Sequence, residues 1–408
     1  MRIHIIGGGT VFHVRPHLAI SAPAYGETAR EIHHILSGMG VDDVQVNLTR
    51  MASQYPGVSG LETNQDIDRL LTQLTSDPTT KIIFMNAALC DFEGSIMNGE
   101  EQTYSGKSQP RLTSDHNYEL RLTPADKIIR RIREVRKDIF LVGFKTTAGK
   151  SPTEQYLAGL NLLKKSSCNL VLANDIHTRL NQVITPEQSR YHETTDRKMA
   201  LRGLVEMTLL RSKLHFTRSQ IVPGEAVRWD SDIVPDSLRT VVNHMIARGA
   251  YKPFNNATVG HFAYKVDDTR FVTSRRKVDF NKLSEIGMVM VEAKDRDSVV
   301  AHGFKPSVGG MSQRIIFSAH PELDCIVHAH VPLRPGAGIP VRSQREFECG
   351  SHECGQNTSD GLENFDGIRA VMLDQHGPNV VFNRSMDPRK VIDFIEKNFD
   401  LGGRTDNI

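Results

Sequence analysis

The sequence contains little of what marks a secreted, membrane-bound or nucleic-acid-binding protein. Its 408 residues include only 5 cysteines, too few for a disulfide framework, which predicts a reducing compartment. No apolar run approaches the roughly 18 residues of a membrane-spanning helix, and the first residues lack a signal-peptide pattern. The formal net charge is +2, which favours neither nucleic acid nor a membrane surface as partner. These absences predict a cytoplasmic protein.

The first half of the chain has the pattern of a parallel sheet. A chain of this length is expected to form two domains. Short apolar runs alternate with helical patterns, which is typical of βαβ units. Helix starts are predicted at Thr123-Pro124 and at Ser151-Pro152, where an N-cap hydroxyl precedes a proline and an acid. The predicted strands are at residues 2–6, 81–85, 139–142 and 170–172.

The pattern changes after about residue 212. Residues 212–234 contain Pro223-Gly224 and the only tryptophan, and they are expected to connect the domains. Pro235 then opens a helix with one apolar face that Gly249 stops. Short strands recur after it, and a helix from Pro388 closes a mixed α/β domain. The predicted strands are at residues 260–266, 270–273, 288–292, 325–330 and 370–373, and the predicted domains are 1–211 and 235–408.

Three histidines follow β-like runs in the second half. His328 and His330 lie two positions apart, so on a strand their imidazoles point the same way and one ion can bind both. A lone His-x-His pair is more often a pair of hydrogen-bonded core histidines. His376 follows another apolar run. Three neutral imidazoles with open positions make a catalytic metal site rather than a closed structural one.

Over roughly residues 235–400 the sequence resembles the class II aldolase/adducin family. Thr258-Val259-Gly260-His261 lies where that family has a Gly-Asn-x-Ser turn. The other matching motifs are Val272-Thr273-Ser274, Lys305-Pro306-Ser307, His328-Ala329-His330 and His376-Gly377. The resemblance implies an α/β/α domain whose histidines hold a divalent metal, most simply zinc. That ion polarises a carbonyl or enediolate oxygen during retro-aldol cleavage, epimerisation or dehydration.

The same resemblance assigns a substrate phosphate to the turns. Backbone amides and hydroxyls there hold it, and the residues that match are Thr258, His261, Ser274 and Ser307. Two positions depart from the family. His261 replaces an asparagine, and Val308-Gly309-Gly310 follows Ser307 where many members have a glutamate that acts as acid/base or fourth ligand.

Either another group transfers the proton, for which residues 345–355 hold the candidates, or the domain binds a metal without the family's chemistry. This stretch is rich in acids and thiols, and its acid/base candidates are Glu348, His352 and Glu353. One interpretation is a loop over the metal, with Cys349 as a further thiolate ligand. A second is a solvated loop without a catalytic role. A third is a separate zinc held by Cys349, His352 and Cys354, which lacks a fourth ligand at suitable spacing.

Polar and glycine-rich segments follow each predicted strand of the first half. Gly7-Gly8-Gly9-Thr10 comes after the first strand and can bring backbone amides close to a phosphate. Arg15 is suited to bidentate phosphate contact. The segments after the later strands include Asp91, Lys107 and Asn174. All lie at the carboxyl ends of strands, where open α/β sheets bind ligands.

Over about residues 1–210 these motifs resemble the phosphopantothenate–cysteine ligase family, the synthetase half of the bifunctional coenzyme A enzyme. The resemblance implies a Rossmann-like fold that binds CTP or ATP. The residues that match its nucleotide site are Gly8, Gly9, Thr10, Asp91, Lys107 and Asn174. Residues 19–26 lack the asparagine and lysine of the family's Asn-Arg-Ser-Ser-Gly-Lys segment.

Three hypotheses follow from the two resemblances. The first is a two-domain enzyme whose second domain is a metal-dependent lyase or epimerase for a phosphorylated small carbonyl or sugar substrate. The second is a ligase of the phosphopantothenate–cysteine type. The third is a binding protein that keeps both folds without either chemistry. Both families imply a homo-oligomer, a dimer for the ligase fold and a tetramer for the aldolase fold.

Overall fold

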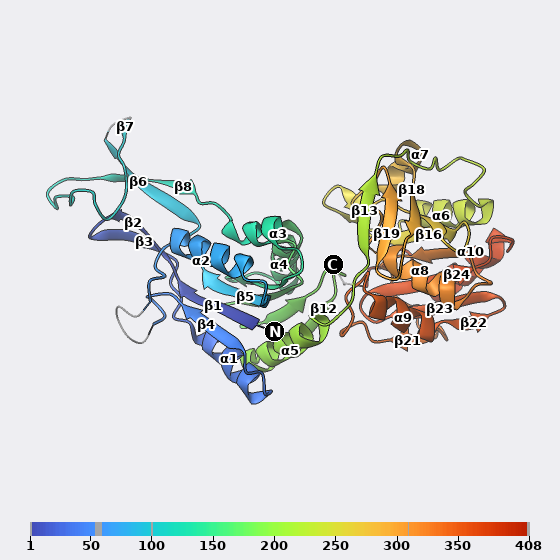
Figure 1. Cartoon of the computed structure of the whole chain (residues 1–408), viewed down its shortest axis with the longest axis horizontal. Coiled ribbons are helices and arrows are strands. Elements are labelled where there is room, and N and C mark those ends of the chain that lie inside the picture. Colours follow the sequence, from blue (N-terminus) through green and yellow to red (C-terminus); the bar gives the residue numbers. More distant parts are fainter. Residues whose placement is uncertain (1, 54–58, 99–100, 309, 406–408) are drawn as a thin grey trace. The chain divides into compact units, whose positions relative to one another are not determined.

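The computed structural model describes residues 2–53, 59–98, 101–308 and 310–405. The chain forms two compact units (Figure 1). Unit 1 comprises Met1–Pro186 and Tyr191–Ser212, and unit 2 comprises Glu187–Arg190 and Lys213–Ile408. Compared with the predicted domains, unit 2 also takes in the expected connection and a four-residue segment from within the first half.

Unit 1 is built on a mostly parallel sheet. Its strand order is β12 (Arg190–Thr194), β11 (Asn181–Ile184), β10 (Leu170–Asp175), β9 (Phe140–Thr147), β5 (Thr80–Ala88), β1 (Arg2–Gly9) and β4 (Val44–Leu48). The pairs from β4 to β10 are parallel, and β11 runs antiparallel to β10. The four predicted strands coincide with parts of β1, β5, β9 and β10 to within one residue, which confirms the predicted Rossmann-like sheet.

Helices cover both faces of this sheet (Figure 1). They are α1 (Glu27–Gly38), α2 (Asn64–Ser76), α3 (Arg131–Val135), α4 (Pro152–Ser166) and α5 (Arg197–Arg211). Helices α1 and α5 share one apolar core with Ile3 and Ile5 of β1. The predicted start at Ser151 is confirmed, because Ser151 and Glu154 form a reciprocal capping box at α4.

The helix start predicted at Thr123-Pro124 is wrong. Both residues belong to strand β8 (Glu119–Pro124), which pairs antiparallel with β6 (Phe92–Asn98). Cross-strand pairing with Glu93 therefore overrides the local capping signal at Thr123. Helical turns begin only at Ile128–Arg130 and continue into α3. The remaining short strands of unit 1 are β2 (Val11–Arg15), β3 (Leu18–Ser21) and β7 (Glu101–Gln102).

Unit 2 is built on a mostly antiparallel sheet. Its order is β13 (Arg218–Val222), β19 (Ser298–His302), β18 (Val289–Ala293), β17 (Arg270–Thr273), β16 (His261–Lys265), β20 (Cys325–His328), β24 (Gly377–Phe382), β23 (Ile368–Leu373) and β21 (Val341–Arg342), with β22 (Glu363–Phe365) beside β23. The end pairs β13–β19 and β21–β23 are parallel. Each strand predicted after residue 250 coincides with one of these strands to within a few residues.

Two layers of helices enclose this sheet. They are α6 (Asp236–Ala247), α7 (Leu283–Ile286), α8 (Gly310–Ala319), α9 (His352–Gly361) and α10 (Pro388–Asn398). One core joins α6 and α10 to the sheet face that carries Phe262. A second core joins α8 to the opposite face, which carries Ala263 and Ile326. The predicted α/β/α arrangement is confirmed.

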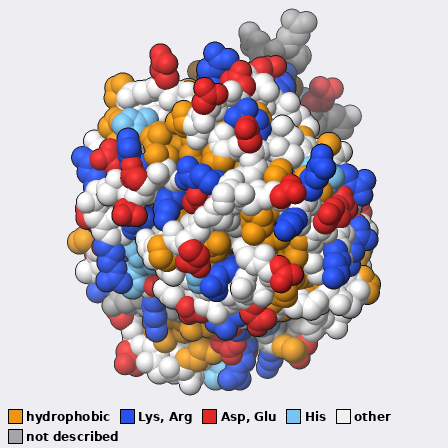
Figure 2. Space-filling view, turned by 90° about the vertical axis from the view of Figure 1, so that its right-hand side faces the viewer, with side chains coloured by type: hydrophobic (Ala, Val, Ile, Leu, Met, Phe, Trp, Pro, Cys, Tyr) orange, Lys and Arg blue, Asp and Glu red, His pale blue; other side chains and the backbone are white. Residues whose placement is uncertain are grey.

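Short elements and surface composition complete the description. The hairpin of β14 (Pro253–Phe254) and β15 (Ala257–Thr258) precedes β16, and a helical turn at Phe280–Lys282 precedes α7. Lys and Arg side chains are interspersed with Asp and Glu on the face shown in Figure 2, in keeping with the small net charge. Within the described ranges, no helix is long and apolar enough to cross a membrane.

Candidate metal centre

The structure brings His328, His330 and His376 together. All three are buried, and the candidate ligand nitrogens lie within 4.8 Å of one another. His328 ends β20 and His330 follows it, whereas His376 lies in the turn between β23 and β24. Gly377 makes this approach possible, because a Cβ there would lie 2.0 Å from the carbonyl oxygen of Ala329. Within the described ranges, this is the only such group of three potential ligands.

Burial keeps the imidazole of His328 neutral. Desolvation lowers the pKa of His328 to about 4, although a hydrogen bond to the backbone of Pro378 opposes the shift. Nδ1 of His328 lies 2.8 Å from the Pro378 carbonyl oxygen, which only accepts, so Nδ1 carries the proton. The lone pair of His328 is therefore on Nε2, which faces Nε2 of His376 at 3.2 Å. Neutral imidazoles with fixed tautomers are what a metal ion requires.

The spacing fits a divalent ion. Zinc bonds imidazole nitrogen at about 2.0–2.1 Å in tetrahedral sites, which places two such nitrogens about 3.3 Å apart. The separation of His328 and His376 is close to that value. The ring centroid of His330 lies 5.3 Å from that of His328 and 4.8 Å from that of His376. Three ligands leave further positions open for a substrate or water.

A second layer of contacts holds the ligands. His261 lies opposite His328 in the β16–β20 register, and the two rings stack with centroids 4.7 Å apart. Nδ1 of His261 lies 2.5 Å from the side-chain amide of Gln313 on α8. At the C-terminal end, Thr405 donates its amide to the His330 carbonyl and its hydroxyl to the His376 carbonyl. The protein therefore restrains each ligand through its ring or its backbone.

The four residues predicted to hold phosphate lie in different environments. The hydroxyl of Thr258 accepts a hydrogen bond from the Phe280 amide at 3.0 Å, and His261 is bound to Gln313. Burial, together with the fields of His328 and His330, lowers the pKa of His261 well below its usual value. Ser274 is fully buried, and its hydroxyl has no hydrogen-bond partner among the described residues. The Ser307 amide donates to the Ser274 carbonyl, which joins two of the three turns.

The acid/base candidates do not form one cluster. His352 and Glu353 begin α9 rather than lying in a loop. His352 bonds the Thr217 hydroxyl at 2.8 Å, and Glu353 accepts from both the amide and the ring of His215. Glu348 lies in the preceding turn, outside the helix. The alternative of a loop throughout residues 345–355 is therefore wrong, because Ser351 caps a helix there.

The thiol candidates are also placed unfavourably for binding a metal. A hydrogen bond with Cys354, burial, and the nearby carboxylates of Glu187 and Glu348 raise the pKa of Cys349 well above its usual value. A thiol ligand must be deprotonated. Within the described parts of the chain, Cys349, His352 and Cys354 form no group of potential ligands. His352 instead faces Thr217.

In unit 1 the glycines predicted to follow the first strand instead extend it, since Gly7–Gly9 belong to β1 and pair with Asn86–Ala88 of β5. The end of β1 lies next to several of the predicted nucleotide contacts. The Thr10 hydroxyl accepts from the Cys90 amide and donates to Asn64, which joins the end of β1 to the start of the Asp91 segment. Lys107 forms an ion pair with Glu62, whose carbonyl accepts the Val11 amide just beyond β1. A Cβ at Gly9 would lie 2.0 Å from the Ala22 carbonyl oxygen, so only glycine fits there.

The other predicted contacts have protein partners of their own. Asp91 forms an ion pair with Lys127. Arg15 is buried and donates to the carbonyls of Val14 and Tyr104 and to the hydroxyl of Thr103. Asn174 accepts from the Thr146 hydroxyl at 3.3 Å. Arg15 therefore contributes to holding the β2 region together. Binding of an anion by Arg15, as predicted, would compete with these bonds.

The reading of the sequence missed the role of Asp175. Its buried carboxylate accepts from the Thr147 hydroxyl and from four amides, those of Gly149, Lys150, His177 and Thr178. These bonds lower its pKa, although burial opposes them. Asp175 thus fixes the turns after β9 and β10 at the carboxyl edge of the sheet. The sequence feature that indicates this role is an acid next to Asn174 at the end of a strand, and the prediction above included only Asn174.

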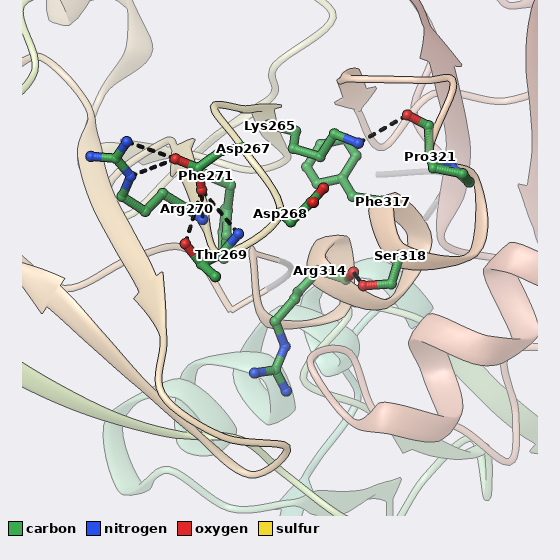
Figure 3. Close-up of a pocket in the computed structure, with 10 residues that line it drawn as sticks. All are labelled: Lys265, Asp267, Asp268, Thr269, Arg270, Phe271, Arg314, Phe317, Ser318 and Pro321. Atoms are coloured by element: carbon green, nitrogen blue, oxygen red, sulfur yellow. Dashed lines mark hydrogen bonds and ion pairs between the residues drawn. The ribbon is translucent and has the colours of Figure 1, made fainter.

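A separate hollow of about 250 Å³ lies beside the β16–β17 hairpin (Figure 3). Four of its charged side chains, those of Lys265, Asp267, Arg270 and Arg314, already have partners within the protein. Asp267 binds Arg270 and Thr269, and Lys265 donates to the Pro321 carbonyl. None of the residues that line it is a predicted site residue.

Known structures are similar to parts of the chain at low sequence identity. The DNA/pantothenate metabolism flavoprotein from Streptococcus pneumoniae is 19% identical, with a TM-score of 0.40, over 51% of this chain and 96% of its own. L-fuculose 1-phosphate aldolase is 17% identical, with a TM-score of 0.32, over 41% of this chain and 82% of its own.

Sequence comparisons assign the two halves to different relatives. Residues 244–333 match the model of the class II aldolase and adducin N-terminal domain. The coenzyme A biosynthesis bifunctional protein CoaBC of Thermococcus kodakarensis is 25% identical over 179 residues, which are 43% of this chain and 41% of that protein. The match thus spans less than half of that relative. The N-terminal half resembles phosphopantothenate–cysteine ligases and the C-terminal half resembles class II aldolases, which confirms both predicted resemblances.

The depressed pKa of His328 predicts how stability depends on pH. In the unfolded chain this imidazole takes up its proton near pH 6.5, whereas in the folded protein it does so near pH 4. The unfolded state therefore binds more protons in that window, and the free energy of unfolding falls as the pH is lowered through it. We expect His328 to account for a loss of about 2 kcal/mol between pH 7.5 and 5 in metal-free protein.

Urea unfolding followed by the fluorescence of Trp229, which is buried in the core of unit 2, measures this loss. A chelator keeps the protein free of metal at both pH values. The His328→Gln variant should lose less stability over the same interval. An equal loss in the variant and the wild type would contradict the assignment.

Proposed function

We propose that unit 2 is a metal-dependent lyase or epimerase for a phosphorylated small carbonyl or sugar substrate. The observation that supports this proposal most is the set of three buried imidazoles with nitrogens within 4.8 Å. His328, His330 and His376 would hold a divalent ion, most simply zinc. The bound ion would supply Lewis-acid stabilisation of a substrate oxygen on which negative charge develops.

Ser274 is the strongest candidate for a contact to the substrate phosphate. A buried hydroxyl costs free energy unless it is hydrogen-bonded, and that of Ser274 has no partner among the described residues. The turn that holds it is joined to Ser307 by the backbone. Thr258 and His261 already bind protein groups. Within the proposal they therefore support the site and do not contact the phosphate.

Glu348 is the candidate acid/base with the best position. The nearby turn at Gly350 packs on Val308, since a Cβ at Gly350 would lie 2.6 Å from Cγ1 of Val308. Val308 follows Ser307, in the segment where related sequences carry their glutamate. Glu348 would thus supply a carboxylate from a different part of the chain. Glu353 and His352 are held by His215 and Thr217.

A non-catalytic role is the second candidate. Unit 1 lacks the asparagine and lysine of the ligase family in residues 19–26, and Leu18–Ser21 instead form β3, which pairs with β2. On this alternative, unit 1 binds CTP or ATP at the glycine-rich end of β1 without joining phosphopantothenate to cysteine. Screening for binding against nucleotides, sugar phosphates and pantothenate derivatives, followed by turnover assays on each ligand, separates the hypotheses. Binding without turnover throughout would favour the non-catalytic role.

The metal site predicts a specific pattern of zinc binding. Metal-free wild-type protein titrated with Zn²⁺ should bind one ion per chain, and His330→Ala should bind it at least about 100-fold more weakly because one ligand is lost. His244→Ala is the control, since it removes an imidazole that pairs with Glu396 in the same unit. Competition with a chromophoric chelator measures the affinities. A wild-type protein that takes up no divalent ion would sink the proposal.

The role of Glu348 predicts a loss of turnover without a loss of binding. With a substrate found in the screen, Glu348→Gln should lower kcat by about 10²–10⁴-fold, because a general acid or base typically contributes that much. Ligand affinity should change little. Glu353→Gln, whose carboxylate instead binds His215, should turn over like the wild type. Equal rates in both variants would exclude Glu348 as the acid/base.

The nucleotide site of unit 1 is tested in the same way. CTP or ATP should bind, and Lys107→Ala should weaken that affinity by about tenfold, because one favourable charge contact is lost. Lys81→Ala is the control, because Lys81 lies near the start of β5, away from the carboxyl ends of the strands, and pairs with Asp138. Calorimetric titration measures both. Release of nucleoside monophosphate from phosphopantothenate, cysteine and CTP together would instead establish ligase activity.

A further inference from the structure

The segment Glu187–Arg190 has an unusual burial for its composition. It follows β11 in the sequence and ends on the first residue of β12, yet it belongs to unit 2. Glu187, Gln188 and Ser189 are only 3%, 1% and 1% exposed. Burying consecutive polar residues costs free energy unless their groups are hydrogen-bonded. The bonds that they make therefore indicate what the segment does.

One set of bonds holds the turn that carries His376. The Ser189 hydroxyl donates to the Gln375 carbonyl at 2.8 Å. The Arg190 amide donates to the Gln375 side-chain oxygen at 3.2 Å. Gln375 itself has a left-handed backbone with φ of 53°, a conformation that residues other than glycine adopt at a cost. Both its backbone and its side chain are thus restrained immediately before a metal ligand.

A second bond holds the turn that carries Glu348. The Glu187 carboxylate accepts from the Cys349 amide at 2.6 Å. A hydrogen bond to an ionised acceptor is stronger than a neutral one. Glu187 therefore fixes the backbone next to the proposed acid/base, only two residues from the serine that fixes the His376 turn.

We propose that Glu187–Arg190 is a positioning segment of the metal centre, which holds the His376 turn and the Glu348 turn in one frame. The inference rests on the proposed function of these two residues. It assigns to unit 2 four residues that lie within the ligase-like half of the sequence. Outer contacts of this kind orient metal ligands, and their loss typically weakens metal binding by 10–100-fold.

Ser189→Ala tests the contact to the His376 turn. We expect zinc affinity to fall by about 10–100-fold and the visible spectrum of the cobalt(II) form to change, because His376 is less well oriented. Ser237→Ala is a matched control, since Ser237 is buried in the same unit and its hydroxyl also donates to a backbone carbonyl, that of Arg384, at 2.8 Å. Wild-type zinc affinity and spectrum in Ser189→Ala would overturn the inference and leave the proposed metal site intact.

Hydrogen exchange tests the segment without any metal. Glu187→Ala should speed amide exchange in a peptide that contains Cys349, and Ser189→Ala in one that contains Gln375 and His376. Glu187→Gln keeps an oxygen that can accept from the Cys349 amide, so it should restore slow exchange. Trp229 fluorescence checks that each variant is folded. Wild-type exchange in both peptides of both alanine variants would overturn the inference, even if the wild-type protein bound no zinc and the proposed function failed.

Discussion

Desolvation of His328 at the end of β20 is the constraint on which the rest of the proposed metal centre depends. A histidine placed there cannot ionise near neutral pH, because burial holds the pKa of His328 at about 4. Its tautomer is set by a carbonyl that only accepts, that of Pro378. The ring therefore presents a lone pair toward His376 rather than a proton. Without that environment, a proton on His328 would compete with a metal ion.

Contacts from the surrounding fold hold the three histidines in place. Gly377 lets the β23–β24 turn approach Ala329 closely enough for His376 to meet His328. The register of β16 against β20 puts His261 over the ring of His328. Thr405 binds the carbonyls of two ligand residues from the end of the described chain. Segments far apart in the sequence thus converge on a few atoms, and precise orientation of ligands requires such support.

The polar groups of unit 1 differ from the imidazoles of unit 2, because they are charged. The charged groups near the end of β1 are paired within the protein, as Lys107 is with Glu62 and Asp91 with Lys127. Asp175 accepts five hydrogen bonds and so shapes the carboxyl edge of the sheet without offering a free charge. If unit 1 binds a phosphate as proposed, that phosphate must exchange existing ion pairs for new ones. Affinity there depends on the difference between the two sets of contacts.

The sequence by itself determined the two folds and the three imidazoles, because apolar periodicity and short motifs act over a few residues. It could not show that Thr123 pairs across strands, that Ser351 caps a helix, or that Asp175 binds five donors, since these depend on distant partners. Only the tertiary structure placed Glu187–Arg190 in unit 2, beside His376 and Glu348. Local patterns decide which elements form, whereas the hydrogen-bond partners of buried polar groups are decided by packing.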